Sequence, residues 1–136
     1  MSCDLDHHHP DYPLVSIPTP FVDSRGDLQV LLNRDIKSAV LITSIKGSLR
    51  ANHYHKKDWH YCFVMSGSIK YYFRPTGSTD DPKYVLIEAG QMFFTPPMVD
   101  HAMVFPEDVV FIALSGSSRE QDSYEDDLVR VELVTL

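Results

Sequence analysis

Glycine and proline divide this chain into short apolar segments, and their spacing constrains the fold more than any other feature of the sequence. Beyond residue 13 no segment longer than about ten residues has the periodicity of a helix over a convincing window. The apolar runs are instead short, rich in β-branched and aromatic residues, and separated by turn residues. This pattern predicts an all-β sandwich or barrel.

Ten runs have the length and composition of strands. We expect strands at residues 14–17, 28–32, 39–45, 59–65, 68–74, 84–87, 91–95, 101–105, 109–114 and 128–134. Prolines bound the first run, which therefore suits a sheet edge. The dipeptide Ser66-Gly67 indicates a hairpin between its two flanking strands. Turns or loops are expected at 23–27 and 75–82, and a short helical turn in the acidic stretch at 115–127.

The length of 136 residues fits one domain, which we place at residues 14–136. Residues 1–13 are predicted to be a flexible lead-in, with His7, His8 and His9 as part of that tail. They lack the pattern of a secretory signal, and no apolar run could cross a bilayer. Two cysteines, Cys3 and Cys62, do not suggest a disulfide framework. We therefore expect a cytoplasmic protein.

Charge narrows the choice of partner. Twelve basic residues stand against nineteen acidic ones, which gives a formal net charge of -7. Nucleic acids and anionic membranes select for positive fields, so neither is expected as a partner. A single arginine in a pocket could still bind an anionic small molecule.

Three histidines form the most informative cluster. His53 and His55 are one residue apart, so on an extended strand both side chains leave the same face. His60 follows the turn-like stretch KKDW and would face the same spot from a neighbouring strand if the chain reverses there. Clustered imidazoles suit Zn, Fe, Ni, Cu or Mn. The alternative is that all three are polar residues on a solvated sheet face.

Two separate segments resemble the paired motifs of the cupin superfamily. The first motif is G-x5-HxH-x3/4-E-x6-G, and Gly47, His53, His55 and Gly67 match it, with His60 at the glutamate position. The second is G-x5-PxG-x2-H-x3-N. Gly90, Pro96 and His101 match it, whereas Met98 replaces its glycine and Phe105 its asparagine.

This resemblance implies a jelly-roll barrel, a double-stranded β-helix, with a metal ion in its mouth. It implies that His53, His55, His60 and His101 bind a divalent transition metal, Fe, Mn, Zn, Ni or Cu. Four neutral ligands leave the full positive charge on the ion, which makes it a stronger Lewis acid. Such an ion would support an isomerase or epimerase, or a dioxygenase if it is iron or copper.

Strand alternation predicts the other residues of this pocket. If His60 faces inward, so do Cys62 and Val64, while Tyr61 and Phe63 face outward. If His101 faces inward, Met103 and Phe105 follow it. Tyr71 and Phe73 would add an aromatic wall, although all of these residue types are also common in cores.

Arginine supplies the expected contact to an anionic substrate. Arg50, three residues before His53, could bind a phosphate or carboxylate at the rim, or could pair with a surface acid. Arg25 offers a weaker version of the same contact.

A second resemblance concerns the sugar-nucleotide cupins. The stretches FVDSRGDLQVLL and RANHYHK are similar to the F-x-D-x-R-G turn and R-G-x-H-Y segment of the dTDP-4-dehydrorhamnose 3,5-epimerases. The second stretch is also similar to the R-G-x-H-x-H-K segment of the dTDP-sugar 3,4-ketoisomerases. The likeness implies that Arg50 contacts the nucleotide diphosphate and that His53 or His55 is the catalytic base. Those enzymes generally work without metal, Ala51 replaces their glycine, and no position here matches the tyrosine of the epimerases.

Three functions follow from these observations. The first is a metal-dependent enzyme of carbohydrate or secondary metabolism, of the isomerase, epimerase or dioxygenase type. The second is a metal-free sugar-nucleotide 3,5-epimerase or 3,4-ketoisomerase. The third is a non-catalytic barrel that binds a ligand. Because small barrels expose sheet edges, we also expect a homodimer, paired through the 14–17 strand or the terminal strand.

Overall fold

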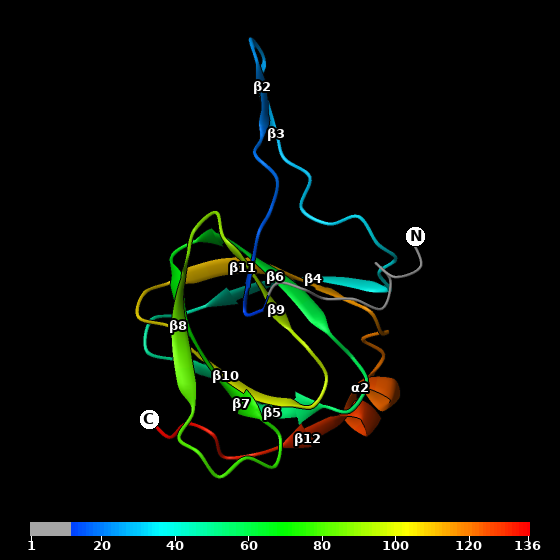
Figure 1. Cartoon of the computed structure of the whole chain (residues 1–136), viewed down its shortest axis with the longest axis vertical. Coiled ribbons are helices and arrows are strands. Elements are labelled where there is room, and N and C mark those ends of the chain that lie inside the picture. The colour runs from blue at the N-terminus through cyan, green and yellow to red at the C-terminus, as the bar shows by residue number, and fades with distance from the viewer. Residues whose placement is uncertain (1–11) are drawn as a thin grey trace.

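Two antiparallel five-stranded sheets face each other and form a jelly roll. The computed structural model describes residues 12–136, with the backbone alone at 121–123 (Figure 1). The strand order is β1-β9-β6-β11-β4 in the first sheet and β12-β5-β10-β7-β8 in the second. A separate two-stranded sheet, β2-β3, projects from the first sheet. The all-β cupin barrel expected from the sequence is confirmed.

The strands are short, as the turn residues indicate. Their bounds are β1 Leu14–Val15, β2 Phe21–Asp23, β3 Gly26–Leu28, β4 Ser38–Ser44, β5 Leu49–His55, β6 His60–Ser66, β7 Ser68–Pro75, β8 Lys83–Glu88, β9 Met92–Thr95, β10 Val99–Val104, β11 Val109–Ser115 and β12 Leu128–Arg130. One helix, α2 Gln121–Asp127, lies in the acidic stretch where a helical turn is expected. No helix in the described part of the chain is long and apolar enough to cross a membrane.

The core lies between the two sheets. Every second residue of β11 is buried, as period-two alternation requires. Its Phe111 stacks on Phe105, and Tyr71 packs against Phe93. Each such aromatic side chain contributes about 1.5–3 kcal/mol to the free energy of folding when it leaves water. Cys62 and Val64 belong to this core, as strand alternation predicts.

A second apolar cluster covers the outer face of the first sheet. Tyr61 faces outward on β6, as predicted, but it is buried there with Met92 and Phe94. The segments before β2 and after β3 supply the cover, through Val15, Ile17, Leu31 and Leu32. These contacts anchor both ends of the projecting β2-β3 hairpin.

The hairpin predicted at Ser66-Gly67 is wrong. Strand β6 pairs with β9 and β11, whereas β7 pairs with β8 and β10, so the chain crosses between the sheets at Gly67. Gly67 has a φ of 83°, and a Cβ there would lie 2.2 Å from the carbonyl oxygen of Asp108. A close crossing between sheets and a tight hairpin both need glycine, so the Ser66-Gly67 dipeptide alone does not distinguish them.

The turn at KKDW is also a crossing. Strands β5 and β6 belong to opposite sheets, so His60 faces His55 across the barrel and does not lie on a neighbouring strand of the same sheet. Two other strands differ in extent. The 28–32 strand is replaced by β3, which ends at Leu28, and the terminal strand ends at Arg130.

Candidate functional site

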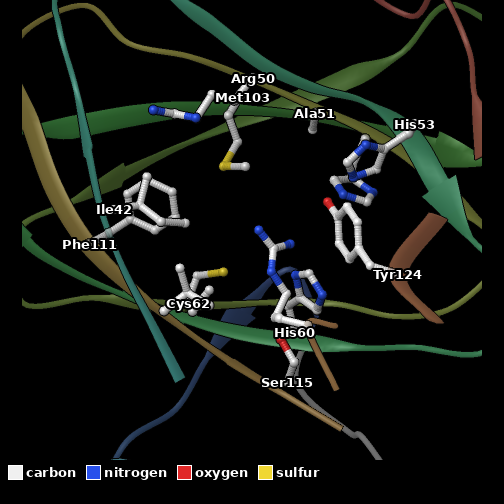
Figure 2. Close-up of a pocket in the computed structure, with 14 residues that line it drawn as sticks. Ile42, Arg50, Ala51, His53, His60, Cys62, Met103, Phe111, Ser115 and Tyr124 are labelled. Atoms are coloured by element: carbon white, nitrogen blue, oxygen red, sulfur yellow. The ribbon is translucent and has the colours of Figure 1, made fainter. Parts of the chain in front are cut away.

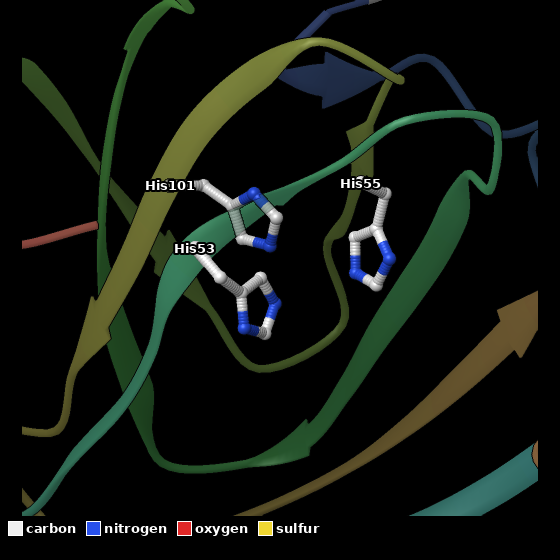
Figure 3. A group of neighbouring side chains, drawn as sticks. All are labelled: His53, His55 and His101. Atoms are coloured by element: carbon white, nitrogen blue, oxygen red, sulfur yellow. The ribbon is translucent and has the colours of Figure 1, made fainter. Parts of the chain in front are cut away.

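Four histidines gather at one end of the barrel interior. His53 and His55 come from β5, His101 from β10 and His60 from β6 of the opposite sheet. The ring centroid of His53 lies 4.8 Å from that of His55 and 4.7 Å from that of His101. The centroids of His55 and His60 are 4.7 Å apart. Figure 3 shows His53, His55 and His101 turned toward a common centre.

A bulge in β5 places Arg50 on the same face as the histidines. His53 pairs with His101 and Arg50 pairs with Met103, and the register shifts between these two pairs. In a regular strand, residues three apart would face opposite sides. The extra residue reverses the alternation, so Arg50, Met103 and His53 all line the pocket. The bulge itself is formed by Ala51 and Asn52, whose φ angles of 70° and 60° are both positive.

The carboxylate of Asp127, at the end of α2, orients His55. It lies 3.0 Å from His55 Nδ1, and it also accepts the backbone N–H of Lys57 at 2.8 Å. Because a carboxylate only accepts, Nδ1 of His55 carries the proton and Nε2 keeps its lone pair. This Nε2 is buried and has no hydrogen-bond partner among the described residues.

His101 and His60 are oriented in a similar way. His101 Nδ1 donates to the carbonyl of Val99 at 3.1 Å, which leaves its Nε2 free to accept. His60 Nε2 lies 3.1 Å from the carboxylate of Asp58, a buried residue. Burial alone would raise the pKa of Asp58, but the hydrogen bond from His60 holds that pKa below its ordinary value.

Burial keeps three of the imidazoles neutral. It lowers the pKa of His53 to about 3, and His55 and His60 add to the effect. Burial is the main cause that lowers the pKa of His101 well below its ordinary value, and the electrostatic effect of His53 adds to it. Burial is also the main cause that lowers the pKa of His55. The electrostatic effect of His60 adds to it, whereas the hydrogen bond to Asp127 opposes it. At neutral pH these three rings can therefore accept a proton or bind a metal ion.

His53, His60 and His101 line a pocket that lies between the sheets beside β4, and His55 is not among its lining residues. Its free volume is about 120 Å³, and Val40 and Ile42 of β4 form part of its wall (Figure 2). Two pocket residues with ionisable side chains, Arg119 and Tyr124, were missed by the sequence analysis. The Arg119 guanidinium stacks 4.0 Å above the Tyr124 ring. Figure 2 shows Tyr124 on the same side of the pocket as His53. Tyr124 lies in an acidic stretch without a motif, so only the fold reveals it.

The other residues predicted to bind substrate fall in two places. Met103 and Cys62 line the pocket. Tyr71 and Phe105 are fully buried in the core, where Tyr71 accepts a hydrogen bond from Thr95. Neither has exposed surface with which to contact a ligand. Arg25 lies outside this pocket, at the tip of the β2-β3 hairpin, where it pairs with Asp23 at 2.6 Å. The stretch His7–His9 lies outside the described residues.

The histidines fit a metal ion as a set of three. One ligand atom from each of His53, His55 and His101 lies within 4.8 Å of the others. His60 falls in a second group, with His55 and Asp58. The fit is supported by the unpartnered Nε2 of His55, since a buried nitrogen lone pair normally has a partner. The other ring nitrogens of His55 and His101 donate to the carboxylate of Asp127 and the carbonyl of Val99, and such acceptors are typical partners of metal-binding histidines.

A jelly roll with paired histidine motifs in its barrel defines the chain as a cupin-fold protein. No protein-family model matches the chain, and no curated protein matches it.

Its fold is similar to those of solved 3,4-ketoisomerases and of a solved 3,5-epimerase. It is similar to a double mutant of the QdtA 3,4-ketoisomerase from Thermoanaerobacterium thermosaccharolyticum in complex with TDP, with 26% identity over 86% of this chain and 85% of that one, at a TM-score of 0.70. A 3,4-ketoisomerase from Helicobacter canadensis matches at 20% identity over 90% and 92%, with a TM-score of 0.72. The dTDP-4-dehydrorhamnose 3,5-epimerase from Sulfolobus tokodaii matches at 22% identity over 79% and 71%, with a TM-score of 0.63.

Proposed function

We propose that this chain is an isomerase that acts on a nucleotide-linked 4-keto sugar by moving a proton beside the ketone. The observation that carries the proposal is that His53, a neutral base, and Tyr124, a hydroxyl donor, line one pocket together with Arg50. The structural neighbours support the same chemistry, because they are 3,4-ketoisomerases and 3,5-epimerases. The segment His53-x-His55-Lys56 favours the ketoisomerase over the epimerase.

The proposed reaction is a balanced proton transfer. His53 removes the proton from carbon 3 of the sugar, and the electron pair forms an enediolate across carbons 3 and 4. Tyr124 delivers a proton to carbon 4, and the proton on the oxygen of carbon 3 passes to the oxygen of carbon 4, which leaves a 3-keto, 4-hydroxy sugar, an isomer of the substrate. The imidazolium of His53 then loses its proton and the phenolate of Tyr124 regains one through solvent, so the protein returns to its starting state. The anionic enediolate stabilises the imidazolium of His53, which offsets the low pKa that burial imposes in the free protein.

Arginines on two sides supply the charge for the nucleotide. Arg50 lines the pocket and is held by Ser44 and by the carbonyl of Thr43. Arg119 lines it from the start of the acidic stretch. In a chain with a net charge of -7, two arginines in one pocket favour an anionic ligand. A pocket of about 120 Å³ would hold only the reacting part of such a ligand, with the nucleotide outside it.

The test is incubation with TDP-4-keto-6-deoxyglucose in deuterated water, followed by NMR. We expect a 3-keto product that carries deuterium at carbon 4. A product that keeps the 4-ketone and carries deuterium at carbons 3 and 5 would identify an epimerase instead. If a His53→Gln variant forms no 3-keto product and incorporates no deuterium, while the control variant Tyr84→Phe does both, His53 is assigned as the base. Absence of any exchange with the unmodified protein would contradict the proposal, and would favour the non-catalytic ligand-binding barrel.

A second candidate is a metal-dependent form of the enzyme. The unpartnered Nε2 of His55 favours it, because this atom together with His53 and His101 would hold a divalent transition metal. When bound, the ion would polarise the ketone or activate dioxygen. Elemental analysis after purification without nickel affinity tests this candidate. We expect one equivalent of metal that is lost in both His53→Ala and His101→Ala while the fold is kept. A full equivalent retained in either variant would exclude the shared site.

A cytoplasmic location and a homodimer remain part of the proposal.

A further inference from the structure

The inward-facing row of side chains on β11 ends in a single hydroxyl group. Alternate residues of this strand are buried, and the first three of them, Val109, Phe111 and Ala113, are apolar. Ser115 is the fourth and is 1% exposed. Alanine is nearly as large as serine and is common in cores, so packing alone does not require a hydroxyl at this position.

The Ser115 hydroxyl lines the pocket without a partner. Its Oγ is buried, and no described residue forms a hydrogen bond with it. Buried polar atoms normally have partners, and an unpaired one destabilises the folded state. A hydroxyl both donates and accepts hydrogen bonds, so this atom is suited to bind the oxygen atoms of a sugar in the pocket.

Backbone contacts hold Ser115 in place. The residue is the cross-strand partner of His60 in β6, and its carbonyl accepts the N–H of Lys37 at 2.9 Å. The next residue, Gly116, lies so close to Trp59 that an added Cβ would be 2.5 Å from the indole ring. This rigid support is what a group that must meet reacting atoms at a fixed distance requires.

Ser115 and the proposed base lie on opposite walls of the pocket. Ser115 and its partner His60 belong to the first sheet, whereas His53 belongs to the second. Figure 2 shows Ser115 beside His60, with Tyr124 on the side of His53. The C–H and C–O bonds diverge at carbon 3 of a sugar. A base that reaches the hydrogen from one wall therefore leaves the oxygen to the other wall.

We propose that Ser115 is a further catalytic residue, which relays a proton from the oxygen of carbon 3 to the oxygen of carbon 4. The inference rests on the proposed function, because the isomerisation requires this transfer. The Oγ accepts the proton from the oxygen of carbon 3 while its own proton passes to the anionic oxygen of carbon 4. Each oxygen that gives or takes a proton does so once, so the serine is regenerated without becoming charged.

The neighbouring side chains on this wall are less suited to the relay. The Nε2 of His60 is engaged with the carboxylate of Asp58 at 3.1 Å, so its ring offers the pocket only an acceptor. Cys62 also lines the wall, but a thiol is a weak donor and a weak acceptor. Among the described residues that line the pocket from the first sheet, Ser115 thus has the one side chain that can donate and accept at once.

Steady-state kinetics and chemical denaturation of single variants test the relay. Ser115→Ala should lower kcat about 100-fold with little change in KM, and Ser115→Thr, which keeps a hydroxyl, should recover part of the loss. The denaturation midpoint of Ser115→Ala should be no lower than that of the unmodified protein, because the substitution removes an unpaired buried hydroxyl. A serine with a purely structural role would show the reverse, a lower midpoint with an unchanged kcat.

Ser68→Ala is the matched control. Ser68 is also buried, but it lies outside the pocket and its hydroxyl donates to Glu107 at 2.8 Å. This variant should lower the midpoint and leave kcat unchanged. A fully active Ser115→Ala, a midpoint lowered as much as in Ser68→Ala, or a Ser115→Thr as slow as Ser115→Ala would overturn the relay alone. If the unmodified protein does not convert the sugar, the proposed function fails and the relay fails with it.

Discussion

Tyr124 is the pocket residue with the most specific chemical role, because a phenol can donate the proton that the proposed isomerisation requires. Tyr124→Phe removes only the hydroxyl and keeps the stack with Arg119. We expect kcat to fall by about 10²–10⁴-fold with little change in KM, as for loss of a general acid. Steady-state kinetics with the 4-keto sugar nucleotide measure this. Tyr84→Phe, on the exposed face of β8, is the control, and equal losses in both variants would remove Tyr124 from the mechanism.

Cys62 borders the same pocket but is predicted to be chemically inert. Its side chain is almost fully buried, and burial raises the pKa of its thiol far above the usual range. In a Cys3→Ser background, iodoacetamide at pH 8 should modify Cys62 at least about 100-fold more slowly in the folded protein than in denaturant. Mass spectrometry follows the reaction. Modification at the rate of a free thiol would show that the pocket opens to expose β6.

At the level of elements, the bulge in β5 contains a residue that differs from the related motifs and that strains the backbone. Ala51 and Met98 stand where the related motifs carry glycine, and both have positive φ, 70° and 59°. A left-handed conformation costs an alanine about 1–2 kcal/mol relative to its usual backbone. Asn52 offsets part of that cost, because its side chain bonds both to the carbonyl and to the N–H of Val134 and so ties the bulge to the C-terminal segment.

Ala51→Gly should therefore stabilise the protein. We expect a gain of about 0.5–1 kcal/mol in the free energy of unfolding, after allowing for the extra entropy of glycine in the unfolded chain. Chemical denaturation followed by the fluorescence of Trp59, the single tryptophan, measures it. Ala39→Gly in the exposed strand β4 is the matched control and should destabilise by a similar amount. If both variants lose stability alike, the positive φ at residue 51 carries no strain.

The strands could be located from the sequence, but their connections could not. Alternation and turn residues placed β4, β8 and β11 to within about a residue or two, because both signals are local. Whether a strand turns back within its sheet or crosses to the other depends on contacts far along the chain, as at Gly67 against Asp108. The same limit applies to the site. His53 and His55 were predicted from spacing and His101 from its resemblance to the second cupin motif, whereas Asp127 and Tyr124 reach the pocket only through the docking of α2.

For the whole molecule, the buried histidines make stability depend on pH. The unfolded chain protonates His53 near pH 6.5, but the folded protein does so only near its pKa of about 3. Between these values the unfolded state binds more protons, so stability is complete above pH 6.5 and falls as the pH decreases. At pH 5 the loss is about 2 kcal/mol for His53, and His55 and His101 add to it in the same direction.

Denaturation in the presence of a chelator, at pH 7.5, 6 and 5, measures this dependence through Trp59 fluorescence. A His53→Gln variant lacks one of the coupled protonation sites, so between pH 6 and pH 5 it should lose about 1.2 kcal/mol less stability than the unmodified protein. Carboxylates titrate equally in both proteins and cancel in the comparison. Parallel curves for the two proteins would mean that His53 is already protonated in the folded barrel at pH 5, which would contradict the pKa shift that burial causes.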